Sequence, residues 1–230
     1  GRDTATAQGG FYVLEMLYKK MGLKKDHATV AIQGFGNAGM NFAKIAHKRG
    51  YKIVAVSDSR GGIYNPIGLD IKNVIKHKEV AGSVVNFPGA KNITNEKLLE
   101  LSIDILAPAA LENVVTAKNV GLVKAKIILE LANGPVSAEA DEKLNKKGIL
   151  VVPDVLANAG GVIVSYFEWV QNIRHFYWDL EKVNDRLKQQ ITKAFAAVWA
   201  AKEKYNTDMR AAAYIVAIEK LGKALKVRGI

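Results

Sequence analysis

Short runs of apolar, often β-branched residues recur along the first two thirds of the chain, and each run ends in small or polar residues. The five runs cover residues 29–33, 53–56, 103–106, 127–131 and 149–152. Runs of this length and composition predict buried strands. Because segments with helical spacing separate them, the pattern is typical of βαβ units. It predicts an α/β fold with a doubly wound, mostly parallel sheet.

Helical periodicity marks both ends of the chain. Residues 3–21 carry apolar side chains at helical spacing, and Gly22 follows as a stop signal. Beyond residue 160 the chain is predicted to be helical, with long amphipathic runs at 179–204 and 208–226. We interpret the apolar stripe of the first run as core packing, with a partner-binding face as the alternative. Its members are Leu180, Val183, Leu187, Ile191, Phe195, Val198 and Trp199.

A single domain accommodates these elements, because the sequence contains no repeat, low-complexity tract or Gly/Ser linker. We divide residues 1–230 into a leading helix at 1–22, a sheet-forming core at 27–160 and a helical extension at 161–230. Inside the core, Thr94 and Ser137 each precede a helical segment and are predicted N-caps.

The first predicted strand runs into a glycine-rich turn. Gly34, Gly36 and Gly39 match the pattern G-x-G-x-x-G before a helix at 40–48, and Asp58 ends the next strand 19 residues past Gly39. In this context the pattern is a dinucleotide-binding fingerprint of Rossmann-like domains. Gly34 would permit the tight turn, Gly36 the approach of the pyrophosphate, and Gly39 close packing of helix on strand. The alternative is an ordinary glycine-rich turn.

Other unusual segments also follow strands. They are residues 57–59, 107–110, 132–135 and 153–161. Ligands bind beyond the carboxyl ends of the strands in an open parallel sheet. The segments therefore predict one continuous ligand crevice.

In the last of these segments, the glycine pair 160–161 indicates a close backbone approach at a helix start. Asn158 and Ser165 are seven residues apart, so one helix covering both would place them on one face, roughly 10 Å apart. The amide could bind a nicotinamide carboxamide and the hydroxyl a carboxylate. Alternatively, Asn158 caps the helix and Ser165 is a small packing residue.

Composition narrows the class of protein. Apolar residues make up 49% of the chain, as in globular proteins with a core. The absence of cysteine excludes disulfides and thiolate chemistry, and we expect no metal site. The net charge is +11, but the lysines are scattered among acidic residues, so we interpret them as solvated and predict no nucleic-acid partner. An acidic partner domain is the alternative explanation for the charge.

The sequence also bears on location. No apolar stretch is long enough to span a membrane, so we expect no membrane partner. The polar start with Arg2 and Asp3 is unlike a signal peptide. We predict a cytoplasmic protein, and the start at Gly1 without methionine indicates a cut or processed fragment.

Several longer motifs resemble those of a known family. They are GFGNAG at 34–39, VAVSDSRGGIYNP at 54–66, APAA at 107–110, LANGP at 131–135, PDVLANAGGVIVSYFEWVQN at 153–172 and DMRAAAYIVAIEKLG at 208–222. The chain resembles the second, cofactor-binding domain of glutamate dehydrogenases, followed by that family's carboxyl-terminal helices.

The resemblance implies site residues. Thr6 and Asn158 would hold the nicotinamide carboxamide, and Ser165 would contact the side-chain carboxylate of glutamate or 2-oxoglutarate. The other implied residues are Gly34, Gly36, Asn37 and Ala38 around the pyrophosphate, Asp58 at the adenosine ribose, and Ala109 and Asn133 along the groove. Phe35, Gly39 and Ser59 complete the predicted cofactor-binding set. Ala7 departs from the glycine that the family usually has after the threonine.

The resemblance also implies what is absent. In this family the catalytic lysine and aspartate lie in an amino-terminal substrate domain, so we expect no catalytic residue here and cofactor binding without turnover. The parent would be a hexameric enzyme of amino-acid metabolism that interconverts glutamate and 2-oxoglutarate plus ammonia. Two alternatives remain open: a leucine, valine or phenylalanine dehydrogenase, and a non-catalytic dinucleotide-binding module. Asp58 favours NAD, whereas Arg60 would suit the 2′-phosphate of NADP.

Overall fold

Within residues 1–229, which the computed structural model describes, seven strands form one sheet in the order β4-β3-β2-β1-β5-β6-β7. Its parallel part consists of β1 (Thr29–Gln33), β2 (Lys52–Asp58), β5 (Ile105–Pro108), β6 (Ile127–Leu129) and β7 (Leu150–Val152). All five strands overlap the predicted apolar runs. The expected α/β fold with a mostly parallel sheet is therefore confirmed.

The sheet beyond β2 is antiparallel, and here the expected simple alternation of strands and helices is wrong. Asp58 at the end of β2 pairs with Gly61 at the start of β3 (Gly61–Tyr64), so only two residues form the turn. The edge strand β4 (Lys91–Ile93) pairs antiparallel with β3. The sequence pattern missed this pair because β3 starts with two glycines and β4 is short and mostly exposed.

Alternating side chains of the parallel strands build a core on each face of the sheet. Val30 and Ile32 of β1 point to one face, and Ala31 points to the other. The helices on the first face include α1 (Ala5–Lys20), α2 (Asn37–Lys48) and α3 (Ile71–Ala81). Those on the second are α4 (Asn95–Leu99), the 3-10 turn η1 (Val120–Leu122) and α5 (Ala138–Lys146). Thr94 and Ser137 cap α4 and α5, as predicted.

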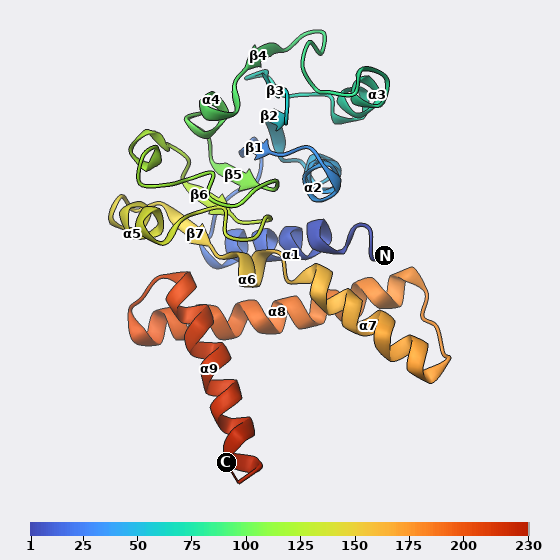
Figure 1. Cartoon of the computed structure of the whole chain (residues 1–230), viewed down its shortest axis with the longest axis vertical. Helices are drawn as coiled ribbons and strands as arrows, with labels where there is room; N and C mark the ends of the chain where they lie inside the picture. The colour runs from blue at the N-terminus through green and yellow to red at the C-terminus, as the bar shows by residue number, and fades with distance from the viewer. Residues whose placement is uncertain (230) are drawn as a thin grey trace.

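Helix α1 lies between the sheet and two of the carboxyl-terminal helices, α7 (Gly160–Arg174) and α8 (Leu180–Tyr205) (Figure 1). A Cβ atom on Gly160 would collide with the carbonyl oxygen of Ala5, and one on Gly9 would come within 2.8 Å of the Gly160 Cα. Glycine at position 160 therefore permits a close helix crossing. This crossing fixes the start of α7 against the first turns of α1.

Helices α8 and α9 (Met209–Val227) confirm the two predicted amphipathic runs. Core packing is confirmed for Val183, Leu187, Ile191, Phe195 and Val198, which are buried. It is wrong for Leu180, which is 58% exposed because it occupies the exposed first turn of α8. Trp199 is half-buried and stacks on Phe195 with ring centroids 5.7 Å apart.

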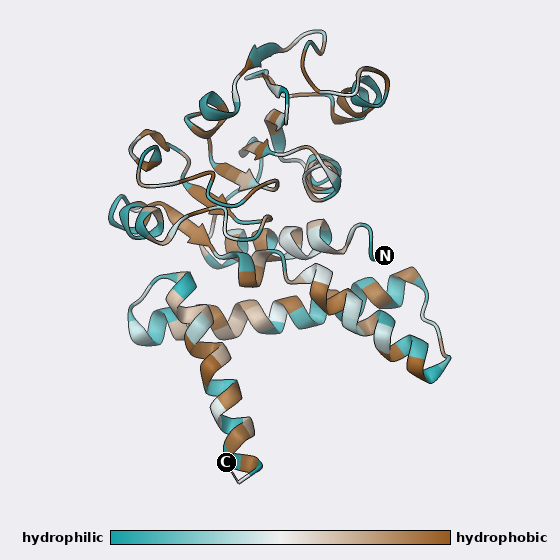
Figure 2. Cartoon of the chain, viewed as in Figure 1, coloured by the Kyte–Doolittle hydropathy of each residue, from teal (hydrophilic) through white to brown (hydrophobic). Residues whose placement is uncertain are grey.

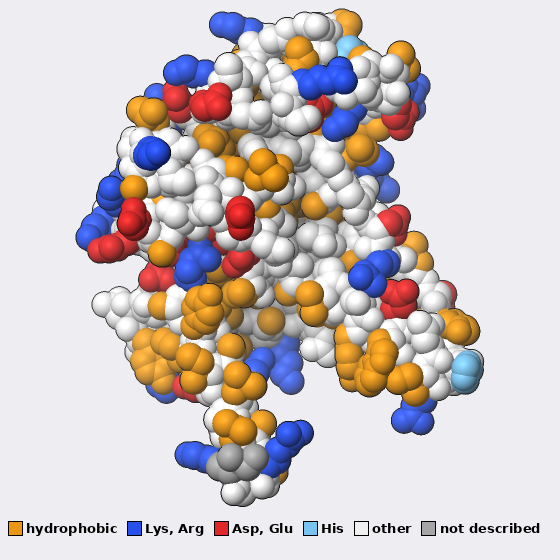
Figure 3. All heavy atoms as spheres, in the orientation of Figure 1, with side chains coloured by type: hydrophobic (Ala, Val, Ile, Leu, Met, Phe, Trp, Pro, Cys, Tyr) orange, Lys and Arg blue, Asp and Glu red, His pale blue; other side chains and the backbone are white. Residues whose placement is uncertain are grey.

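Helix α9 projects from the body of the molecule and is largely hydrophobic (Figure 2), and apolar side chains are exposed on it (Figure 3). They recur at helical spacing and so share a face; the row is Tyr214, Ile218, Leu221 and Leu225. A second exposed row on α7 consists of Val162, Tyr166, Trp169 and Ile173. Neither these helices nor any other within residues 1–229 is both long and apolar enough to cross a membrane.

Candidate functional site

A cleft of about 1220 Å³ opens beyond the carboxyl ends of β1, β5 and β6. The first turn of α1 and the starts of α2 and α7 contribute its other walls. Seven of the predicted site residues line it: Thr6, Asn37, Ala38, Ala109, Asn133, Asn158 and Ser165. The topology explains their convergence, because parallel strands place their carboxyl ends at one edge of the sheet.

Sequence reasoning missed several residues of the cleft. Among them are Arg2, Asp3, Val162, Tyr166 and Trp169. The last three share a face of α7 with Ser165, so helical spacing around that serine was the available signal. The guanidinium of Arg2 lies 2.6 Å from the carboxylate of Glu168, which joins the amino-terminal segment to α7.

The glycine turn beside the cleft confirms two of the predicted roles. Gly34 has a φ of 97°, which residues with a Cβ rarely adopt. A Cβ on Gly39 would collide with the carbonyl oxygen of Gly34, so α2 packs closely on the turn. A Cβ on Gly36, by contrast, would meet nothing within 4 Å. Gly36 therefore faces open space that a ligand could occupy.

The amino terminus of α2 begins at this open space. Its N-cap is Gly36, which has no side chain to bind the first-turn N–H groups, and no acidic residue lies in that turn. The amide of Asn37 is directed elsewhere, since its Nδ2 donates to the carbonyl oxygen of Asp3 at 2.8 Å. The first-turn N–H groups and the positive end of the helix dipole can therefore receive an anion. The pyrophosphate of a dinucleotide fits this arrangement.

Two amide side chains, from the segments that follow β6 and β7, meet in the cleft. The Nδ2 of Asn158 donates to the Oδ1 of Asn133 at 2.7 Å and to the carbonyl oxygen of Ala132 at 3.3 Å. Among the residues that the structure describes, the Oδ1 of Asn158 and the Nδ2 of Asn133 have no hydrogen-bond partner. The pair thus offers one acceptor and one donor, the complement of a carboxamide.

No single helix covers both Asn158 and Ser165, so the expectation of one continuous helix is wrong. Asn158 ends the short helix α6 (Asp154–Ala157), and α7 begins at Gly160. The alternative, that Asn158 caps α7, is also wrong, because the N-cap is Ala159 and makes no side-chain bond. The two residues nevertheless line the same cleft, one from the break between helices and the other from α7.

Thr6 lies close to the start of α7. A Cβ on Gly161 would come within 2.7 Å of the Thr6 Oγ1, so the missing side chain leaves room for this hydroxyl. Ser165 lies one turn further along α7 and is half-buried. Ala7 lies in the core, 1% exposed, and its methyl group does not line the cleft.

Asp58 does not line the cleft, and its carboxylate is hydrogen-bonded within the chain. Oδ1 accepts bonds from the Arg60 N–H and the Ser83 hydroxyl, both at 3.0 Å, and Oδ2 accepts one from the Val84 N–H at 2.8 Å. Burial raises the pKa of the Asp58 carboxyl, but these hydrogen bonds and the nearby Lys78 outweigh burial and hold the pKa below its usual value. Asp58 is therefore ionised at neutral pH, with few acceptor positions left for a ligand.

Lys78 connects this carboxylate to the glycine turn. Its Nζ lies 3.7 Å from the Asp58 Oδ2 and donates to the carbonyl oxygen of Phe35 at 2.7 Å. The Phe35 side chain is fully buried and does not line the cleft. Ser59 is exposed in the turn between β2 and β3. Asp58, Ser59 and the glycine turn thus lie beside the cleft rather than in its lining.

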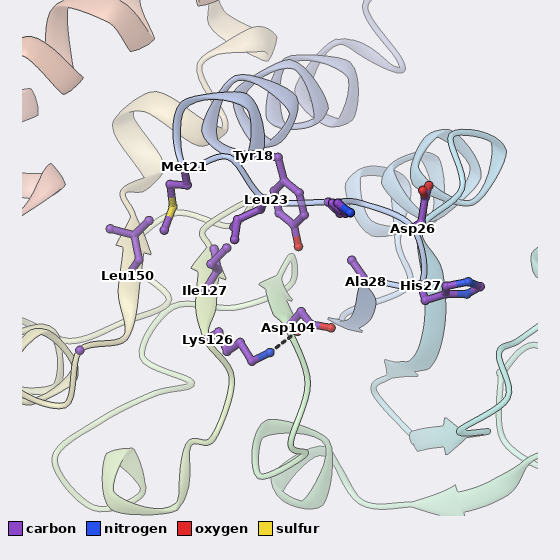
Figure 4. Close-up of a pocket in the computed structure, with 12 residues that line it drawn as sticks. Tyr18, Met21, Leu23, Asp26, His27, Ala28, Asp104, Lys126, Ile127 and Leu150 are labelled. Atoms are coloured by element: carbon purple, nitrogen blue, oxygen red, sulfur yellow. Dashed lines mark hydrogen bonds and ion pairs between the residues drawn. The ribbon is translucent and has the colours of Figure 1, made fainter.

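A second cavity, of about 410 Å³, lies at the opposite edge of the sheet (Figure 4). Asp104, just before β5, accepts bonds there from the Thr29 N–H at 2.8 Å, the Thr29 hydroxyl at 2.7 Å and the Lys126 Nζ at 2.7 Å. Open parallel sheets bind ligands at the carboxyl edge and not at this one. We therefore regard the Asp104 cluster as structural. Nowhere in residues 1–229 do three or more His, Asp or Glu side chains gather to hold a metal ion.

The sheet order, the glycine turn and the cleft beyond the strand ends define a Rossmann-like α/β domain. Sequence comparison identifies the family. The family described as Glutamate/Leucine/Phenylalanine/Valine dehydrogenase matches residues 1–229. The chain belongs to this family.

Three relatives that match the whole chain are glutamate dehydrogenases. The glutamate dehydrogenase of Thermotoga maritima is 53% identical over 231 residues, and the alignment covers all of this chain and 56% of that enzyme. The NADP-specific enzyme of Synechocystis sp. is 45% identical, with 56% covered, and the catabolic NAD-specific enzyme of Bacillus subtilis is 46% identical, with 54% covered. The chain therefore spans about half the length of these relatives.

A solved structure supports the fold independently. The hetero-hexameric glutamate dehydrogenase from Thermus thermophilus superposes with a TM-score of 0.93 at 36% identity. The superposition covers 100% of this chain and 54% of that one. The similarity extends through the carboxyl-terminal helices, since no part of this chain is left out.

Proposed function

We propose that this chain is the cofactor-binding half of a glutamate dehydrogenase and that its cleft binds a nicotinamide dinucleotide. One observation carries the proposal: the uncapped amino terminus of α2, at Asn37 and Ala38, and the amide pair of Asn133 and Asn158 line one cleft. The names of the relatives support it, because all three are glutamate dehydrogenases.

The α2 terminus and the amide pair each have a part in this proposal. The first-turn N–H groups of α2 bind the pyrophosphate, with Gly36 and Ala38 beside it. The free Nδ2 of Asn133 and Oδ1 of Asn158 bind the nicotinamide carboxamide, with the Thr6 hydroxyl close by. A bound dinucleotide would supply the hydride-transfer chemistry, and the residues of this chain hold and orient it.

We further propose that this chain has no catalytic residue of its own. Hydride transfer requires both reactants in near-attack geometry, and the relatives contain about as much sequence again as this chain provides. Titration with NADH, followed by its fluorescence, should show saturable binding. Incubation with glutamate and NAD should produce no NADH above a no-protein control. Absence of binding would contradict the first proposal, and production of NADH would contradict the second.

Ser165 carries the proposed preference for glutamate. Its hydroxyl lines the cleft on α7, and a hydroxyl can donate to the side-chain carboxylate of glutamate or 2-oxoglutarate. In a chain that also carries the other half found in the relatives, Ser165→Ala should lose one hydrogen bond to a charged group, about 1.5–3 kcal/mol. The loss corresponds to about a tenfold to hundredfold fall in kcat/KM for glutamate.

Norvaline provides the matched control for this test, because it has no side-chain carboxylate. Its kcat/KM should fall far less than that of glutamate, and the Kd for NADH should stay close to the parent value. If glutamate kinetics stay within about twofold of the parent, well below the expected loss, Ser165 is a packing residue. The related leucine, valine or phenylalanine dehydrogenases would then become the better description.

We propose NAD as the preferred dinucleotide. The ionised carboxylate of Asp58 ends β2, where it would repel the 2′-phosphate of NADP. Its acceptor positions are largely taken by Arg60, Ser83 and Val84. Asp58 would therefore act mainly through its charge, and Lys78 at 3.7 Å weakens that charge. The Bacillus subtilis relative is NAD-specific and the Synechocystis relative NADP-specific.

For the complete enzyme we propose a hexamer. The exposed apolar row on α9 supports further association, because contiguous exposed apolar surface marks interaction sites. The matching Thermus thermophilus enzyme is described as hetero-hexameric. Light scattering on the complete enzyme tests this state, and a monomer would contradict it.

A further inference from the structure

We propose that Arg210, which lies outside the cleft, is a positioning residue that holds the loop carrying Asn133 in its binding geometry. The inference rests on the proposed function, because it concerns how the cleft is kept ready for the nicotinamide end of a dinucleotide. Arg210 lies in the first turn of α9, the helix that projects from the body on the side of β7 (Figure 1).

Arg210 joins three carboxylates that come from three different elements. Its Nη2 donates to the Oε1 of Glu130 at 2.7 Å, just beyond β6, and its Nε donates to the Oδ2 of Asp141 on α5 at 3.0 Å. Its Nη1 lies 3.6 Å from the Oδ1 of Asp154 at the start of α6. One guanidinium therefore fixes the relative positions of β6, α5 and α6.

This cluster is largely shielded from water. The side chain of Glu130 is fully buried, and that of Arg210 is 20% exposed. Burial raises the pKa of the Glu130 carboxyl, while Arg210 opposes that rise. Removing one member of a buried charge cluster leaves its partners uncompensated. The carboxylates would then shift to find new partners, and the backbone they hold would shift with them.

Two of the carboxylates hold backbone at the cleft. The Oε2 of Glu130 accepts a bond from the Asp154 N–H at 2.7 Å, and the Oδ2 of Asp154 accepts one from the Gly134 N–H at 2.9 Å. Gly134 follows Asn133 directly in the sequence. The connection thus runs from Arg210 through Asp154 to the loop that presents the Asn133 amide.

The backbone of Asp154 also bears on the position of the second amide. Asp154 begins α6, and the Asn158 N–H that ends this helix donates to the Asp154 carbonyl oxygen at 2.9 Å. Asn133 and Asn158 are therefore both anchored at Asp154. Because these amides must present a donor and an acceptor together, a shift of Asp154 would disturb the carboxamide contact and leave the α2 terminus unaffected.

Because only the carboxamide contact should be disturbed, the test compares the binding of NADH with the binding of ADP-ribose. ADP-ribose keeps the adenosine and the pyrophosphate but has no nicotinamide. Both Kd values are measured by calorimetric titration of the full chain and its variants. Arg210→Met should raise the Kd for NADH by about twofold to thirtyfold, the range of coupling through a network. The Kd for ADP-ribose should stay within about twofold of the parent.

Two further variants keep the outcome interpretable. Asp154→Ala removes the acceptor for the Gly134 N–H while Arg210 keeps Glu130 and Asp141, so it should also weaken NADH alone. Asp104→Asn is the control, because it disturbs a hydrogen-bonded cluster at the opposite edge of the sheet. It should lower the urea midpoint without changing the ratio of the two Kd values.

The results separate this inference from the proposed function. If the parent chain binds neither ligand, the proposed function fails. If the parent binds both and Arg210→Met changes the two Kd values equally or not at all, Arg210 has only a structural role and the inference is overturned. Should Arg210→Met not fold, Asp154→Ala decides the matter by the same ratio.

Discussion

The side chains of Asn158 and Asn133 are joined by a hydrogen bond of 2.7 Å, from the Nδ2 of the first to the Oδ1 of the second. The bond connects the segment after β6 with the segment after β7. It also fixes which atoms remain free, since each amide has one group engaged in the pair. The outcome is one free donor and one free acceptor on the bonded pair, which we propose bind one ligand group together.

Removing the Asn158 amide should weaken binding of the nicotinamide end. Asn158→Ala deletes the free acceptor and releases Asn133, so we expect the Kd for NADH to rise by about twofold to tenfold, as for one or two neutral hydrogen bonds. Fluorescence titration measures this change. Asn172→Ala, an exposed amide on α7, is the matched control and should bind NADH like the parent. Equal effects of the two substitutions would contradict the role of Asn158.

Substitution by alanine should have different effects at Gly36 and Gly39. At Gly39 it should lower stability, and at Gly36 it should weaken ligand binding. Gly39→Ala forces a Cβ onto the Gly34 carbonyl oxygen, so it should cost about 1–3 kcal/mol of unfolding free energy, as overpacking does. Gly36→Ala has room in the free chain and should leave the urea midpoint nearly unchanged. It should nevertheless weaken both NADH and ADP-ribose about tenfold, or ~1.4 kcal/mol. Normal binding by Gly36→Ala would contradict a pyrophosphate site there.

Asp58 should decide between the two dinucleotides through its charge. Asp58→Ser removes the carboxylate and leaves Arg60 and Lys78 in place, so the Kd for NADPH should fall about tenfold relative to that for NADH. Calorimetry with both ligands gives this ratio. Asp26→Asn makes the same change of charge on an exposed residue away from the cleft, and should leave the ratio unchanged. An unchanged ratio in Asp58→Ser would show that another residue discriminates.

Asp104 should stabilise the fold in a pH-dependent manner. Partial burial raises its pKa, but the bonds from Lys126 and Thr29 outweigh burial and hold the pKa below its usual value. The stabilisation is therefore complete above the unfolded-state pKa of about 3.9 and is lost as the pH falls through the lower folded-state value. Urea unfolding should show Asp104→Asn less stable by about 1–3 kcal/mol at pH 7. The difference should shrink below about pH 3.9, and a constant difference down to pH 2 would contradict the assignment.

Much of the fold and part of the site follow from local sequence patterns. The strand β1, the turn at Gly34 and the packing glycine Gly39 depend on neighbours within a few residues, so the sequence was sufficient to predict them. The caps Thr94 and Ser137 are similar, because each binds an N–H group three residues on. Strand β3 was missed because its two glycines hide the apolar alternation that marks a strand.

Contacts between distant residues could not be predicted in this way. Asp58 was expected to face a ribose, but Ser83 and Val84 bind its carboxylate from 25 and 26 residues away. The bond between Arg210 and Glu130 spans 80 residues. No local pattern indicates such pairs. The Asp58 contacts depend on how the segment after α3 meets the end of β2, and the Arg210 contact depends on how α9 meets the segment after β6. The same holds for Arg2 at the mouth of the cleft.

The central claim is that the α2 terminus and the Asn133–Asn158 pair belong to one dinucleotide site, and an NMR titration tests it most directly. In ¹H–¹⁵N spectra of the labelled chain, NADH should shift the amide signals of Gly36 to Gly39 together with those of Asn133 and Asn158. ADP-ribose should shift only the first group. Signals from the cavity at Asp104 and Lys126 should not move. Shifts confined to that cavity, or the absence of shifts at Gly36 to Gly39, would contradict the claim.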